Sequence, residues 1–190
     1  MFNFICKFFL TLNATFLILI VYLIKLDEKE YIQLSEWIKR NLHIKFTFFS
    51  QNTSILFSLL IIVLLTKILI VALKLLETDD LKGVEEVEQV NNSFLPTYLG
   101  YFFIALSINN ARILFWIYFI VFIFTFISSS LYFNPLFLLW GYNFYNITTK
   151  NQVKIFLITK KNIRDPKQVS FEKIKRINNF TYIDMEVYNE

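Results

Sequence analysis

The chain has 190 residues and a formal net charge of +4; 56% of its residues are hydrophobic and only 18% are charged. Soluble domains contain about 45–50% apolar and about 25% charged residues, so a soluble fold of this composition would expose large apolar patches. With only 3 glycines and 3 prolines the chain is neither collagen-like nor a flexible linker, and the composition predicts a mostly α-helical integral membrane protein.

Four apolar runs predict four transmembrane helices, because a span needs about 20 mostly apolar residues. Lys25 follows the first run where a signal-peptidase site would need small residues, so we expect an uncleaved helix. The third run is short and contains Pro96 and Gly100, which leaves a three-span protein as the main alternative. The predicted spans lie near residues 4–24, 55–76, 94–108 and 113–131.

Two polar residues interrupt these runs. Asn13 lies within the first run and Lys67 within the second. An ionisable residue inside a span marks a bundle interior or a water path, unless its long side chain snorkels to the headgroups. We favour snorkelling for Lys67, with the interior role as the alternative.

The connection after the first run is itself patterned. Between residues 31 and 42 the apolar positions recur at helical spacing, and polar residues fill the remaining face. This pattern predicts a surface helix lying on the membrane. A helix packed against the end of the bundle is the alternative.

The segment after the second span is acidic. Val84, Val87 and Val90 recur at three-residue steps, and Glu85, Glu86 and Glu88 lie between them. This spacing predicts a short acidic helix over residues 84–93 that projects into the cytoplasm.

After the last apolar run, the spacing of the apolar residues changes. The Asn134–Pro135 step favours a break in the helix, and apolar residues alternate with period two from Tyr142 to Ile158, across turn residues at 148–152. A last strand is predicted at 180–187. We therefore expect a transmembrane domain over residues 1–141 and a small β unit over 142–190, completed by the membrane part, by other subunits or by a soluble partner.

The charges predict the orientation. Four spans put both termini on one side, and the basic tail favours the cytoplasm. Basic residues beside a membrane bind anionic lipid more readily than nucleic acid when no base-reading motif is present, so we expect contact with the lipid bilayer and no direct binding of nucleic acid. The basic patch consists of Lys160, Lys161 and Arg164.

Together, the acidic segment and the basic patch predict a docking face for a soluble partner. Charges on such a face steer the encounter, and aromatic side chains anchor it. The candidate anchors are Tyr142, Phe144, Tyr145 and Phe156, and packing against the protein's own spans is the alternative for each.

Catalytic and metal-binding patterns are absent from the sequence. The chain has one Cys, one His and only 3 Gly, so it offers neither a Cys/His zinc site nor a glycine-rich phosphate loop. We expect no enzymatic activity, no cofactor and no metal.

Several stretches resemble the membrane subunit of the bacterial Kiwa antiphage defence system, the KwaA-like family. The resemblance rests on residues 87–98, 131–136, 141–145 and 158–164, and order and spacing agree from about residue 84 to the end. It implies a four-span, inner-membrane homo-oligomer. Such a protein senses infection at the envelope and recruits a cytoplasmic DNA-binding effector, with no catalytic residues of its own.

Two other classes fit the composition. Phe, Ile, Asn and Lys are abundant, as in mitochondrially encoded subunits of large membrane complexes, so a structural subunit is one alternative. A small oligomeric ion channel with Lys67 near its pore is the other.

Overall fold

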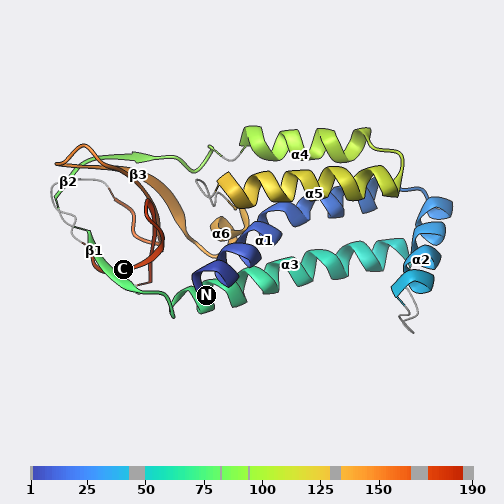
Figure 1. Cartoon of the computed structure of the whole chain (residues 1–190), viewed down its shortest axis with the longest axis horizontal. Helices are drawn as coiled ribbons and strands as arrows, with labels where there is room; N and C mark the ends of the chain where they lie inside the picture. The colour runs from blue at the N-terminus through green and yellow to red at the C-terminus, as the bar shows by residue number, and fades with distance from the viewer. Residues whose placement is uncertain are drawn as a thin grey trace.

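The computed structural model describes residues 2–42, 50–81, 83–93, 95–128, 134–163 and 171–185. Helices form one end of the molecule and a β-sheet forms the other, and a short helix lies across the far end of the helical part (Figure 1). The chain is therefore a mixed structure in which apolar helices carry a C-terminal sheet.

Three helices are long and apolar enough to cross a membrane, judged by length and composition. They coincide with the first, second and fourth predicted spans. A fourth apolar helix, α4, occupies the third predicted span but has only 13 residues, so four spans remain a prediction. The helices are α1 (Phe2–Lys25), α3 (Gln51–Leu73), α4 (Leu95–Ser107) and α5 (Ala111–Ser128).

Helix α1 is the centre of the bundle, since α3, α4 and α5 each pack against it. Its buried residues include Leu10, Ala14, Ile18 and Tyr22, which recur every four positions and so share one face. Helix α5, in contrast, exposes large apolar side chains such as Phe115 and Phe124. An exposed apolar surface of this kind fits a lipid environment.

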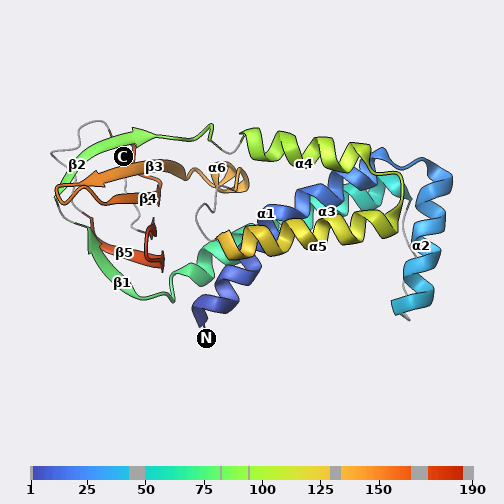
Figure 2. The ribbon, with the colours of Figure 1, turned by 45° about the horizontal axis from the view of Figure 1, so that its top comes forward.

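The helix predicted over residues 31–42 is confirmed as α2 (Glu28–Leu42). It lies across the far end of the bundle (Figures 1 and 2). Tyr31 is buried there, and its hydroxyl shares a hydrogen bond of 2.5 Å with the hydroxyl of Ser54. The Lys25 ammonium also ties the far end together, because it donates to the Ile108 carbonyl oxygen at 2.7 Å.

The sheet has six strands in the order β1-β5-β6-β4-β3-β2. The predicted hairpin is confirmed as the antiparallel pair β3 and β4, and the predicted last strand as β6. Strand β5 was not predicted. The strands are β1 (Thr78–Leu81), β2 (Val84–Gln89), β3 (Asn143–Thr149), β4 (Lys154–Thr159), β5 (Phe171–Asn178) and β6 (Thr181–Asp184).

The prediction of an acidic helix over residues 84–93 is wrong, because this segment begins with strand β2. Strand β2 pairs antiparallel with β3, and the register shifts between Val84 and Glu86. Such a bulge inserts one extra residue, so positions three apart face the same side of the strand. The three-residue spacing of Val84 and Val87 therefore fits a bulged strand.

Strands β1 and β2 come from the connection between the second and third apolar runs, so the sheet is not confined to residues 142–190. The chain itself thus supplies strands that complete the sheet. They are the two edges of the sheet, and only two residues separate them in the sequence. The sheet accordingly curls, with β1 and β2 meeting at one end (Figure 2).

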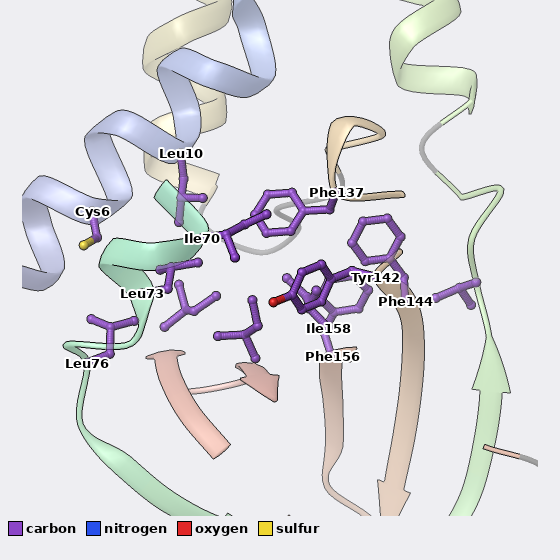
Figure 3. Packing of buried hydrophobic residues seen from close by; sticks show 13 residues of the cluster. Cys6, Leu10, Ile70, Leu73, Leu76, Phe137, Tyr142, Phe144, Phe156 and Ile158 are labelled. Atoms are coloured by element: carbon purple, nitrogen blue, oxygen red, sulfur yellow. The ribbon is translucent and has the colours of Figure 1, made fainter. Parts of the chain in front are cut away.

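Both faces of the sheet are buried. One face encloses a sheet cluster of Leu81, Val84, Tyr145, Ile147, Ile155, Leu157, Phe171 and Ile174. The other face packs against the ends of α1 and α3 and the short helix α6 (Leu136–Leu139), forming a joint cluster (Figure 3). The joint cluster consists of Cys6, Leu10, Ile70, Leu73, Leu76, Val90, Phe137, Tyr142, Phe144, Phe156, Ile158, Ile177 and Ile183.

Candidate functional site

The acidic residues predicted for docking lie on the β2 edge of the sheet. Glu85, Glu86 and Glu88 are all exposed. Glu85 accepts a hydrogen bond of 3.0 Å from the amide of Gln152, which lies in the hairpin turn. An open hollow of about 550 Å³ adjoins the end of β2 and is lined by residues 88–93 and Pro96. The edge therefore combines negative charge, unpaired strand backbone and a concave surface.

The basic residues lie at the other end of the strands. Lys160 and Lys161 follow β4, and β3 separates β4 from β2. Because Thr159 pairs with Asn143 whereas Val84 pairs with Thr149, the lysines are remote from Glu85 and Glu86. Arg164 lies outside the described residues.

Each of these lysines lies over an aromatic ring of its own chain. The Lys160 ammonium is 5.0 Å from the centroid of the Tyr142 ring, and the Lys161 ammonium is 5.6 Å from that of Phe171. Cation–π contacts of this kind hold the charge close to the sheet. The acidic edge and the basic patch are thus two separate surfaces.

The prediction that Tyr142, Phe144 and Tyr145 anchor a partner is not supported, because all three side chains are buried in the chain's own core. Their exposed fractions are 6%, 0% and 1%. Both faces of the sheet are covered, so Phe144 on one face of β3 and Tyr145 on the other are both internal. Burial and, to a lesser extent, the nearby Asp184 carboxylate raise the pKa of the Tyr142 phenol above its ordinary value.

Asn13 lies at the centre of a buried polar group within the bundle, which we call the polar triad of Asn13, Thr66 and Asn134. The Asn13 amide donates to the Thr66 hydroxyl at 2.9 Å, and the Asn134 amide donates to the Asn13 side-chain oxygen at 2.6 Å. Asn13 and Thr66 are fully buried, and Asn134 is 2% exposed. The triad joins α1, α3 and the segment that leads to the sheet.

Asn134 also lies two residues before the start of helix α6. Its side-chain oxygen accepts a hydrogen bond of 3.0 Å from the backbone N–H of Leu136, which fixes the turn before α6. The sequence indicated a break at Asn134–Pro135 but not this contact. Thr66 was missed altogether, because a single threonine in an apolar run is common and gives no sign of its partner.

Lys67 lies on the exposed surface of α3, and the snorkelling interpretation stays a prediction. Its ammonium is 5.0 Å from the centroid of the Trp140 ring, just after α6. Next to it in the sequence, Thr66 points into the polar triad. Neighbouring positions of α3 thus present a hydroxyl to the bundle and a charge to its surroundings.

Within the part of the chain that the structure describes, no group of three or more His, Cys, Asp or Glu could hold a metal ion. Comparison with protein families identifies one described as anti-phage protein KwaA, which matches residues 6–183 of the chain. Comparisons with curated proteins and with solved structures find no match.

Proposed function

This chain belongs to the KwaA family of anti-phage proteins, and from that membership we propose a specific role in antiphage defence. The chain is a non-enzymatic, homo-oligomeric component of the bacterial inner membrane. It senses infection at the membrane and anchors or regulates a soluble cytoplasmic DNA-binding effector. The observation that carries this proposal is the joint cluster, because it connects candidate spans directly to a sheet with an exposed edge. The family match gives no support to a structural respiratory subunit or to an ion channel.

The order of the paired strands along the chain supports a four-span topology. Strands β2 and β3 pair with each other, yet α4 and α5 lie between them in the sequence. Paired strands lie on one side of a membrane, so the chain between them crosses it an even number of times. If the candidate span α5 crosses the membrane, α4 must cross as well, and this supports the proposal of four spans. By the same reasoning, α1 and α3 return the chain to the side on which it began.

Cysteine labelling tests this topology. In a Cys6→Ser background, we expect Asn110→Cys, in the connection from α4 to α5, to react with an impermeant maleimide added to intact cells. We expect Asn179→Cys, in the turn between β5 and β6, to react only after the inner membrane is permeabilised. Both positions are exposed. Labelling of both from one side would contradict four spans, and the reversed pattern would contradict a cytoplasmic sheet.

Transmission of a signal from the spans to the sheet follows two connections. The polar triad links α1 and α3 to Asn134, which fixes the turn before α6. Phe137 of α6 then lies in the joint cluster, with residues of α1, α3 and the sheet. A displacement of α1 relative to α3 within the membrane would therefore move α6 and change its packing against the face of the sheet.

The β2 edge is the surface on which we expect the effector to bind. An edge strand offers unpaired backbone groups to a second chain, and its three glutamates favour a basic partner. Charges at the rim of an interface mainly raise the association rate. The buried aromatic residues of β3 take no direct part.

The triple variant Glu85→Gln, Glu86→Gln and Glu88→Gln tests this role of the acidic edge. We expect the association rate of the effector to fall about tenfold at low salt, with a smaller difference at high salt, because salt screens the charges. Binding kinetics at two ionic strengths provide the measurement. Glu28→Gln with Glu36→Gln, on α2 at the far end, is the matched control. An association rate that stays at the wild-type value would exclude this edge as the docking surface.

A further inference from the structure

Lys67 is a charged group within an apolar helix, and no carboxylate of the described residues forms an ion pair with it. The contact that the structure gives its ammonium is the face of the Trp140 ring at 5.0 Å. An ammonium at the edge of a bilayer is costly to desolvate without an anion. The aromatic ring orients this charge but does not neutralise it.

The level of Lys67 along the bundle follows from its neighbours. Thr66 is bonded to Asn13, which accepts from Asn134 at the start of the segment that leaves the bundle. Lys67 and Trp140 therefore lie where the chain passes from the apolar helices to the sheet. Lysine and tryptophan are both enriched at this boundary, where lipid headgroups begin.

The surface of α3 around Lys67 has room for a lipid. Leu60, Leu64 and Val71 share the face of Lys67 at steps of three and four residues, and their side chains are 54%, 48% and 55% exposed. Leu60 and Leu64 lie on the membrane side of Lys67, where an acyl chain would lie along them. Lys74, seven positions further on, is also exposed. This face of α3 thus combines exposed apolar residues with two lysines, Lys67 and Lys74, nearer the sheet.

A second donor beside Lys67 has no acceptor. The indole Nε1 of Trp140 is buried and has no hydrogen-bond partner in the described structure. Protein structures seldom leave such a group without an acceptor. Because the Nε1 atom is buried, a lipid at this position would meet the exposed Lys67 ammonium, with which no carboxylate of the described residues pairs, and the Trp140 ring beside it.

We propose that the Lys67 ammonium, held over the Trp140 ring, binds the phosphate of an anionic phospholipid in the leaflet that faces the sheet. The lipid phosphate neutralises the Lys67 ammonium, and the acyl chain packs along Leu60 and Leu64. The site lies beside the polar triad and α6, so the bound lipid stabilises the level at which the bundle meets the sheet. The inference rests on the membrane placement of α3 and is independent of the effector.

Lipid binding to the full purified chain tests the proposal. Native mass spectrometry would follow retention of phosphatidylglycerol and, separately, of phosphatidylcholine, for wild type and for Lys67→Gln. We expect Lys67→Gln to bind phosphatidylglycerol about fivefold more weakly, which corresponds to about 1 kcal/mol. Lys67→Arg should restore most of the binding, and Trp140→Leu should reduce it, because the ring no longer holds the cation.

The matched control is Lys29→Gln, an exposed lysine of α2 at the far end of the bundle. It should bind phosphatidylglycerol like the wild type. Equal binding by wild type and Lys67→Gln would overturn the proposal, as would an equal loss in Lys29→Gln, which would indicate general attraction to anionic lipid. Displacement of the lipid by millimolar inorganic phosphate would show a site for free phosphate and would also overturn it.

Discussion

Replacing Phe144 by alanine is expected to lower the free energy of unfolding by about 3–5 kcal/mol, because it empties the middle of the joint cluster. The Phe144 side chain is fully buried, and its ring stacks on that of Phe156 with centroids 5.7 Å apart. The Phe144 ring also lies next to the ring of Phe137 in α6, with centroids 6.5 Å apart (Figure 3). Unfolding in mixed detergent micelles measures the loss.

Phe180→Ala is the matched control for this prediction. Phe180 lies in the same sheet region, in the turn before β6, but its side chain is 60% exposed. Its truncation should change the free energy of unfolding by less than about 0.5 kcal/mol. Equal stabilities for the two variants would mean that the sheet and the bundle do not share a packed joint.

Replacing Asn13 by alanine is expected to lower the free energy of unfolding by about 2 kcal/mol, because it removes two buried hydrogen bonds at once. The Asn134 amide loses its acceptor, and the Thr66 hydroxyl loses its donor. Single hydrogen bonds between transmembrane helices contribute about 0.6 kcal/mol on average, but here Asn13 also binds Asn134, whose side-chain oxygen fixes the turn before α6. The unfolding assay in detergent applies to this variant as well.

Asn92→Ala provides the comparison for Asn13→Ala, because Asn92 is an exposed asparagine in the turn before α4. Its substitution should change the stability by less than about 0.5 kcal/mol. If Asn13→Ala were as stable as the wild type, the polar triad would contribute nothing to the joining of α1, α3 and α6. Proteolysis of the sheet at native conditions adds a local readout, since loosening of α6 should expose the strands next to it.

The elements that depend on local patterns could be predicted from the sequence. The apolar runs are continuous, and the alternation from Tyr142 to Ile158 is a local property of two adjacent strands, so helices and hairpin were found. Strand β2 was not predicted, because its bulge depends on the register with β3, which is far away in the sequence. Strand β1 has only four residues, two of them aspartates, and resembles a polar connection.

The residues of the candidate site likewise divide into those that the sequence could identify and those that it could not. Asn13 could be selected because an amide in an apolar run needs a partner, but its partners Thr66 and Asn134 become visible only when three segments are packed together. Tyr142, Phe144 and Tyr145 were misread because alternation in a strand usually means one open face. Here the helices cover one face and the curled sheet covers the other.

The interleaved origin of the sheet has a consequence for synthesis on the ribosome. Strands β1 and β2 emerge before α4 and α5, whereas their partners β5 and β3 emerge after both helices. Under the proposed four-span topology, the two early strands remain without these partners until the α4–α5 hairpin has entered the membrane, and the glutamates of β2 keep that strand soluble in the meantime. In that topology, a hairpin inserted incorrectly would deliver β3 to the opposite side, so the sheet would close only after correct membrane insertion.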